Sequence, residues 1–142
     1  MNQFKKVVPE KISFNKDFNR NKDLLAEKLF EKKVIIIGGA GTIGSSYIKQ
    51  ILKFKPSIIT VVDFNENALT ELTRDLRSSK LLNYNPEYST YPVNLLSDTF
   101  DKVFKLHEWD IVANFAAHKH VRSEKDSISV EALIKNNVFG AI

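Results

Sequence analysis

The stretch Val34-Ile35-Ile36-Ile37-Gly38-Gly39-Ala40-Gly41-Thr42-Ile43-Gly44 decides how this chain of 142 residues folds. Its first four residues are β-branched and predict a buried strand. Three glycines at intervals of three, Gly38, Gly41 and Gly44, follow, and a helical pattern comes next. Glycine allows a tight turn and a close approach of the backbone to a ligand, and a helix that begins there points free N–H groups at an anion. The stretch therefore predicts a site for the pyrophosphate of a dinucleotide.

An acidic residue supports the same interpretation. Asp63 ends the next apolar run, Ile58–Val62, nineteen residues after Gly44. A dinucleotide site has a carboxylate at about 20 residues from the glycines, where it accepts hydrogen bonds from the adenosine ribose. An ordinary strand-to-helix turn, with glycines that serve only close packing, is the alternative. A phosphate-binding P-loop is excluded, because Ser45 stands where its lysine is required.

The composition is that of a soluble globular domain. Apolar residues make up 43% of the chain and charged residues 27%. No apolar run is long enough to span a bilayer, and the N-terminus has no apolar signal-peptide core, so we expect a cytoplasmic location and no membrane contact. The chain has no cysteine, which excludes disulfides, thiolate zinc sites and cysteine nucleophiles.

The positive charge lies in an N-terminal extension. Residues 1–33 contain nine Lys and Arg against five Asp and Glu, whereas residues 34–142 contain twelve of each. A basic extension of this kind is usually a solvated tail, so we expect no nucleic-acid partner. The chain therefore divides into a basic arm with a short amphipathic helix, residues 1–32, and a nucleotide-binding domain, residues 33–142.

The pattern of the whole chain predicts an α/β fold. Residues 1–22 are expected to be irregular, and Asn65 or Asn67 and Ser97 are expected to cap helices. The expected helices cover residues 23–32, 42–54, 68–80, 98–106 and 127–142, and the expected strands cover residues 34–37, 58–62, 88–93 and 110–115. Such alternation predicts a Rossmann-like three-layer αβα arrangement with a parallel sheet of order 3-2-1-4. No strand follows the last helix, so we expect a truncated fold in which residues 111–115 form an apolar edge.

Two later segments resemble a known family. These are Asn114-Phe115-Ala116-Ala117-His118-Lys119-His120-Val121 and Ile134-Lys135-Asn136-Asn137-Val138-Phe139-Gly140. They are similar to the HAAxKHV and TNVxGT patterns of extended short-chain dehydrogenases that act on nucleotide sugars. In particular, the chain resembles the bacterial polysaccharide-biosynthesis proteins that include UDP-N-acetylglucosamine 4,6-dehydratases. The glycine spacing and Asp63–Leu69 fit the same family, and the resemblance covers residues 34–142.

The resemblance implies an NAD cofactor, with NADP as the alternative, and it assigns a role to each matching residue. NAD is preferred because Phe64, rather than a basic residue, follows Asp63. The residues implied to hold the pyrophosphate are Gly38, Gly41 and Gly44 with the amides of Thr42 and Ile43. Asp63 is implied to contact the adenosine ribose, and Asn94, where the family usually has aspartate, is implied to lie beside the adenine with Leu95.

The same resemblance implies how the other half of the site is arranged. Ala116 and Ala117 are expected beside the nicotinamide half, Lys119 and His120 are expected to face the substrate, and Asn137 is expected to support the site from behind. His118 and His120 could also form a metal pair, but two histidines without carboxylate or thiolate ligands rarely do so, and we expect no metal.

The function that the resemblance implies is the NAD(P)-binding portion of a nucleotide-sugar 4,6-dehydratase or epimerase of polysaccharide biosynthesis. The substrate would be a UDP-sugar, and the last helix resembles the family's dimerisation helix, which implies a homodimer. The family's catalytic lysine follows a tyrosine or methionine by four residues. No tyrosine here has that lysine, and Met1 with Lys5 matches only within the arm. We therefore expect no catalytic residue and no turnover by this chain alone. Another extended short-chain reductase and a non-catalytic dinucleotide-binding module remain alternatives.

Overall fold

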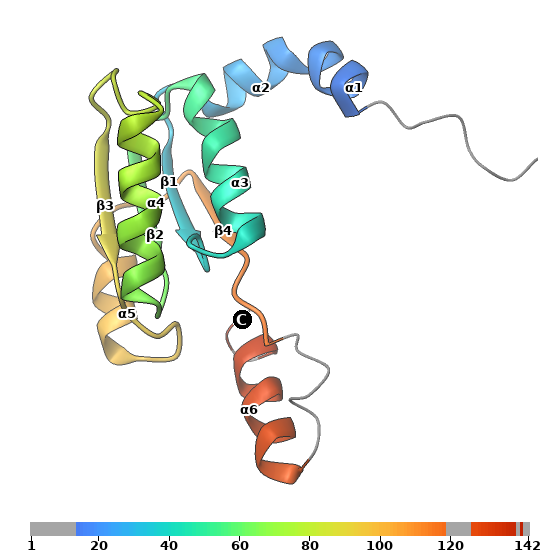
Figure 1. The fold of residues 1–142 in the computed structure, drawn as a ribbon, viewed down its shortest axis with the longest axis vertical. Helices are drawn as coiled ribbons and strands as arrows, with labels where there is room; N and C mark the ends of the chain where they lie inside the picture. Colours follow the sequence, from blue (N-terminus) through green and yellow to red (C-terminus); the bar gives the residue numbers. More distant parts are fainter. Residues whose placement is uncertain (1–13, 119–125, 139, 141–142) are drawn as a thin grey trace, which may run out of the picture.

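A parallel sheet of four strands forms the centre of the computed structural model, which describes residues 14–118, 126–138 and 140 (Figure 1). The strand order is β3-β2-β1-β4, as predicted. The strands are β1 (Lys33–Ile37), β2 (Ile58–Val62), β3 (Glu87–Tyr91) and β4 (Ile111–Asn114). In register, Ile35 of β1 pairs with Thr60 of β2 and with Val112 of β4. The glycine stretch therefore leaves the sheet from its interior, between two neighbours.

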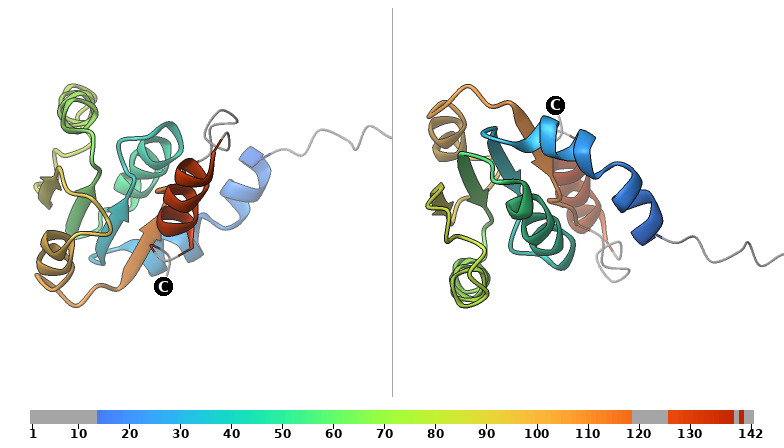
Figure 2. Two further views of the ribbon diagram at one scale, coloured as in Figure 1. Left: turned by 90° about the horizontal axis from the view of Figure 1, so that it is seen from below. Right: turned by 90° about the horizontal axis from the view of Figure 1, so that it is seen from above.

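Helices cover both faces of the sheet (Figure 2). On one face lie α3 (Thr42–Ile51), the 3-10 turn η1 (Leu52–Phe54) and α4 (Glu66–Ser78), and on the other lies α5 (Asp98–Phe104). Alternate residues of β1 point to the two layers: Val34 and Ile36 pack with α3 and α4, whereas Ile35 and Ile37 pack with Phe100 of α5. The near-continuous apolar run of β1 is thus explained by burial on both sides.

The predicted helix caps are confirmed. The Asn65 side chain accepts a hydrogen bond from Ala68 N at 3.0 Å at the start of α4. The Ser97 hydroxyl accepts one from Phe100 N at 3.3 Å at the start of α5. The third strand was predicted at residues 88–93 and is found earlier, because Glu87 N donates to Ser57 O and the ladder with β2 begins there.

The prediction of an irregular segment over residues 1–22 is wrong for its described part. Helix α1 (Phe14–Arg20) is followed by α2 (Lys22–Leu29). The polar sequence of α1 gives no strong helical pattern, but Phe18 packs on Phe54 of η1 with ring centroids 5.9 Å apart. A contact across 36 positions therefore stabilises a helix that the local sequence does not predict.

Helix α6 (Ser127–Asn137) lies beyond the carboxyl ends of the strands (Figure 1). It is shorter than the helix predicted to continue to residue 142. Asp126 caps it by accepting from Ser129 N at 2.8 Å, and none of its residues is buried. Among the described residues, no helix is both long and apolar enough to cross a membrane.

Candidate dinucleotide site

The glycines build a turn with no room for side chains at two of the three positions. Gly38 has φ +69°, and a Cβ placed there would lie 2.6 Å from Ala116 N. A Cβ on Gly44 would lie 2.5 Å from the carbonyl oxygen of Gly38, so α3 packs directly on the turn. Gly41 differs, because its Cβ would meet only that same oxygen, at 3.4 Å. Close packing therefore explains why positions 38 and 44 require glycine, but it does not explain the glycine at position 41.

The amino end of α3 is the anion-attracting part of this turn. The helix begins at Thr42, and its N-cap is Gly41, which has no side chain to accept from the first-turn N–H groups. These groups and the positive end of the helix dipole are therefore available to a ligand. The amino end of α3 lies next to the carboxyl end of β1 (Figure 1), which is where parallel α/β sheets bind ligands.

Asp63 fastens the glycine turn to the end of β2. Its side chain is 9% exposed, and its two oxygens accept from different backbone N–H groups. One oxygen bonds Ala40 N at 3.0 Å, and the other bonds Asn65 N at 3.0 Å. A carboxylate oxygen has more than one acceptor position, so Asp63 can still accept from a ribose hydroxyl. Its position is thus fixed by the protein before any ligand arrives.

A cavity of about 580 Å³ opens beside this turn. That volume is within the roughly 300–1,000 Å³ of ordinary ligand pockets. Of the predicted residues, those that line it are Gly38, Gly41, Asp63, Asn94, Leu95, Ala116 and Ala117. Thr42, Ile43 and Gly44 are not in its lining and form the first turn of α3. Lys119 and His120 lie outside the described residues, so their predicted role stays a prediction.

Asn94 uses its acceptor atom within its own turn. Its side-chain oxygen accepts from Leu96 N at 2.8 Å, and its backbone oxygen accepts from Ser97 N at 3.1 Å. The amide nitrogen then remains as the hydrogen-bonding group that Asn94 can offer to a ligand. An aspartate at this position would offer only acceptors, so the contact with a base would differ from the family pattern.

Asn137 holds the segment that follows β4. Its side-chain oxygen accepts from His118 N at 2.8 Å, and its side-chain nitrogen donates to His118 O at 2.9 Å. One amide group thus replaces the peptide group of a neighbouring strand. Asn114 adds a second link, because it accepts from Ala116 N at 2.9 Å and donates to Gly140 O at 3.3 Å. The wall of the cavity at Ala116 and Ala117 is therefore connected to the end of α6.

The sequence prediction missed the part of the cavity that α6 supplies. Ala132, Lys135 and Asn136 line it. They are spaced by three and four residues and share one helix face, which is the signal that could have identified them. Lys135 forms an ion pair with Glu131, and this contact holds the pKa of Glu131 below its ordinary value. Lys135 thus brings a positive charge to a cavity whose other wall carries Asp63.

Tyr47 and Tyr84 are not activated as bases. Burial raises the pKa of Tyr47, and it raises the pKa of Tyr84 to about 12. A buried phenol loses solvation when it ionises, so both stay protonated near neutral pH. Residues 14–118, 126–138 and 140 also contain no cluster of three or more His, Asp or Glu that could hold a metal ion.

Comparisons with known proteins agree with this geometry. The sequence profile of the family described as polysaccharide biosynthesis protein matches residues 34–142. An uncharacterized membrane protein of Methanocaldococcus jannaschii is 36% identical over 94 residues, which are 64% of this chain and 25% of that protein. A dTDP-D-glucose 4,6-dehydratase of Dictyostelium discoideum is 35% identical over 122 residues, 80% of this chain and 25% of that protein. The chain thus spans about a quarter of these curated relatives.

A solved structure shares the fold. The Bordetella bronchiseptica enzyme WbmF, solved in complex with NADH, superposes with a TM-score of 0.60 and 24% sequence identity. The match covers 80% of this chain and 30% of that enzyme. At this level of identity the likeness establishes the Rossmann-like fold.

Proposed function

Because this chain belongs to the polysaccharide biosynthesis protein family, we propose that its cavity binds NAD and forms the cofactor-binding part of a nucleotide-sugar 4,6-dehydratase or epimerase. The observation that carries the proposal is the turn between β1 and α3. Gly41 lines the cavity without a packing reason, α3 presents uncapped N–H groups beside it, and Asp63 is fixed at the end of β2. These three features fit a pyrophosphate joined to a ribose.

The residues would hold the cofactor along the carboxyl edge of the sheet. The first turn of α3 would donate N–H groups to the pyrophosphate, because the N–H groups of Gly38 and Gly41 already donate to Val62 O and Gly38 O. Gly38 and Gly41 would let the pyrophosphate approach the backbone closely, and Asp63 would accept from the adenosine ribose. At the other end, Ala116 and Ala117 would let the nicotinamide half lie close to the backbone. When bound, NAD supplies a hydride acceptor for the sugar.

NAD is favoured over NADP by charge. A 2′-phosphate would lie against the carboxylate of Asp63, which carries the same sign of charge. Phe64 follows Asp63 and offers no cation to compensate. Like charges held at short distance repel more strongly when one of them is shielded from water, and Asp63 is 9% exposed. We expect NADP to bind at least about tenfold more weakly, which corresponds to ~1.4 kcal/mol.

The substrate of the complete enzyme would be a nucleotide sugar. The relative from Dictyostelium is named for dTDP-D-glucose, whereas our sequence prediction favours a UDP-sugar. Lys119 and His120 are the residues proposed to face it. No Tyr-x-x-x-Lys occurs in this chain, so we propose that the chain holds the cofactor and does not complete the reaction.

Two measurements on the purified chain test the proposal. Calorimetric titration should show NAD binding at one site and weaker binding of NADP, and an absence of binding by either dinucleotide would contradict it. A coupled assay with UDP-N-acetylglucosamine and NAD should show no 4,6-dehydration. A measurable rate would mean that the catalytic groups lie within residues 1–142 after all.

Helix α6 is proposed as a contact between two copies. Several of its apolar side chains are exposed, namely Ile128, Val130 and Ile134. Light scattering at increasing concentration should show a dimer. Ile128 is 78% exposed, and the Ile128→Asp variant should be a monomer at the same concentrations. A monomer at all concentrations would contradict this part of the proposal.

A further inference from the structure

Helix α6 contributes little to the packing of the domain. None of its residues is buried, and it supplies no side chain to either apolar cluster on the two faces of the sheet. Among the described residues, side-chain hydrogen bonds join it to the rest of the chain only at its carboxyl end, where Asn137 holds the backbone of His118. It also lines the cavity, through Ala132, Lys135 and Asn136. This placement indicates a function at the ligand rather than in the core.

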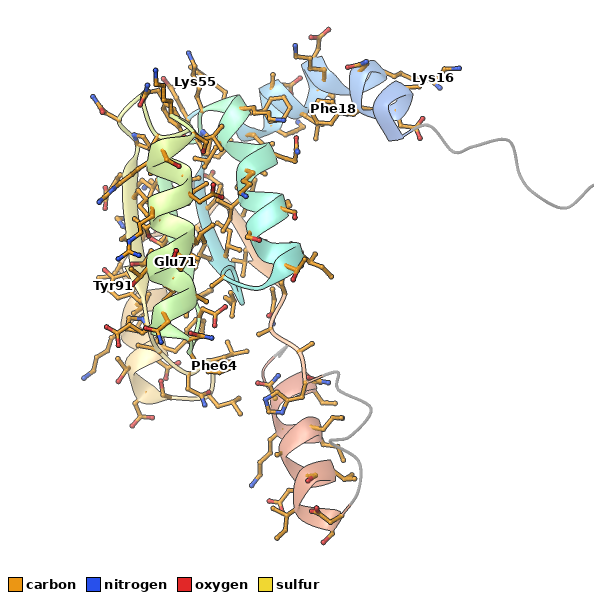
Figure 3. All side chains as sticks on the ribbon, in the orientation of Figure 1. Lys16, Phe18, Lys55, Phe64, Glu71 and Tyr91 are labelled. Carbon is orange, nitrogen blue, oxygen red and sulfur yellow. The ribbon has the colours of Figure 1, made fainter. Side chains whose placement is uncertain are left out.

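Lys135 is the cation of this cavity. Of the described residues that line the cavity, it alone carries a permanent positive charge, and Asp63 carries the negative one. Lys135 lies two positions before Asn137, so the hydrogen bonds at the end of α6 fix its backbone beside the cavity. Figure 3 shows Phe64, another lining residue, at the carboxyl edge of the sheet, with α6 beyond that edge. A ligand in the cavity therefore lies between the sheet and the helix that carries Lys135.

The ammonium group of Lys135 has a partner that it can readily exchange. It pairs with Glu131, one helical turn earlier, and the two side chains are 59% and 63% exposed. Water solvates both charges of such a pair, so the pair adds little to the stability of the fold. A phosphate is a stronger partner for an ammonium group, above all where the walls of a cavity shield the contact from water. Lys135 can therefore leave Glu131 for an anionic ligand at little cost.

The glycine turn cannot neutralise the ligand that is proposed for this cavity. Each phosphate of a pyrophosphate bears a negative charge, whereas the amino end of α3 supplies about half a positive charge. No basic residue occurs in the turn or in the first helical turn of α3, residues 38–46, and Asp63 adds a negative charge nearby. The balance requires a cation from another element, and Lys135 is the one that the described lining of the cavity offers.

We propose that Lys135 binds the pyrophosphate of the cofactor from the α6 side of the cavity, and that it leaves Glu131 to do so. This inference rests on the proposed function. The pyrophosphate then lies between the N–H groups that begin α3 and the ammonium group of Lys135. Because Lys135 belongs to α6, binding holds this helix against the ligand and protects its backbone amides from exchange with solvent. The phosphates, rather than either ring of the cofactor, carry the interaction.

The test compares two variants of the full chain that remove the same ion pair. Lys135→Gln removes the cation, whereas Glu131→Gln removes its helical partner and leaves the cation free, so both variants share any loss of helix stability. Lys28→Gln is the control, because Lys28 forms a similarly exposed ion pair with Glu27 on α2 and does not line the cavity.

Three measurements are made on each variant. Calorimetry at low and at high salt gives the affinity for NAD and for ADP-ribose. Titration followed by nuclear magnetic resonance gives the affinity for adenosine, which has no phosphate. Hydrogen exchange followed by mass spectrometry, with and without NAD, reports how far the ligand protects the amides of α6.

We expect Lys135→Gln to lose about fivefold to tenfold in affinity for NAD and ADP-ribose at low salt, and less at high salt, where screening weakens the contact. Glu131→Gln should bind both ligands about threefold more tightly, because no carboxylate competes for the ammonium group. The Lys28→Gln affinities, and the affinity of every variant for adenosine, should stay within about twofold. NAD should slow exchange over α6 in the unmodified chain and much less in Lys135→Gln.

Two results would overturn the role of Lys135 while the proposed function stands. One is a Lys135→Gln variant that binds NAD as the unmodified chain does. The other is a Glu131→Gln variant that loses as much affinity as Lys135→Gln, which would mean that the ion pair supports the helix rather than the ligand. If the unmodified chain binds neither NAD nor ADP-ribose, the proposed function and this inference fail together.

Discussion

Replacing Gly44 by alanine tests whether the glycine turn is as tight as described. The new Cβ would lie 2.5 Å from Gly38 O and 2.7 Å from Gly39 Cα. Both are backbone atoms, so no side chain can rotate away, and α3 has to withdraw from the turn by nearly 1 Å. Overpacking of this kind costs about 1–3 kcal/mol, and alanine in a helix returns up to about 1 kcal/mol. We expect a net loss of about 1–2 kcal/mol, or roughly 2–8 °C in Tm for a domain of this size.

Gly41→Ala is the matched control, because its Cβ would meet only Gly38 O at an ordinary 3.4 Å. Gly41 also has φ −69°, which alanine adopts without strain. Stability should therefore change by less than about 0.5 kcal/mol. The methyl group would instead enter the cavity where the pyrophosphate is proposed to lie, and NAD affinity should fall by about fivefold or more.

Thermal and urea unfolding monitored by circular dichroism give the stabilities, and calorimetry gives the affinities. The two variants should differ in which property they change. Gly44→Ala should lower the free energy of unfolding, whereas Gly41→Ala should leave it unchanged and lower the affinity for NAD. If Gly44→Ala is as stable as the unmodified chain, α3 does not pack directly on the Gly38 carbonyl. If Gly41→Ala binds NAD normally, the close approach of a ligand to Gly41 is refuted.

Three further changes probe other contacts. Asp63→Asn leaves one of two backbone N–H groups without its acceptor, and should cost about 1–3 kcal/mol in urea unfolding and narrow the preference for NAD over NADP. Asp110 has a lowered pKa because it accepts from Lys33 N, so its stabilisation is full above its unfolded pKa near 3.8 and is lost as pH falls below it. In the Asp110→Asn variant, the urea midpoint of unfolding should therefore fall less steeply as the pH is lowered from about 5 to about 3. Asn137→Ala should speed hydrogen exchange of the His118 amide and weaken the binding of NAD, while Tm changes little. Unchanged exchange would contradict the role of the two hydrogen bonds between Asn137 and the His118 backbone.

The sheet was predictable because its decisive residues are local in sequence. The run Val34–Ile37, the glycines after it and the next apolar run, Ile58–Val62, each identify their own strand or turn from neighbouring residues, and the short connection between the two strands predicts that they pair in parallel. The caps at Asn65 and Ser97 were predictable for the same reason, since a capping side chain bonds an N–H only three residues away.

Elements that depend on distant contacts were not predictable. Helix α1 forms where Phe18 packs on Phe54, and the sequence of residues 14–20 does not indicate which residue Phe18 will contact. Lys135 and Asn136 reach the cavity only because α6 lies beyond the strands' carboxyl ends, which its own sequence does not specify. The sequence alone shows that Phe64 is uncharged, whereas its 77% exposure and its place in the cavity lining depend on the folded arrangement of the strands.

The most direct test of the central claim is a map of the NAD site by nuclear magnetic resonance on the ¹⁵N-labelled chain. We predict that NAD shifts the amide signals of the turn from Gly38 to Gly44 and of Asp63 and Phe64, in proportion to occupancy. Signals of Phe30 and Lys53, which line a separate groove beside α2, should stay in place. Shifts confined to that groove, or no shifts at millimolar NAD, would contradict the claim that this glycine turn is a dinucleotide site.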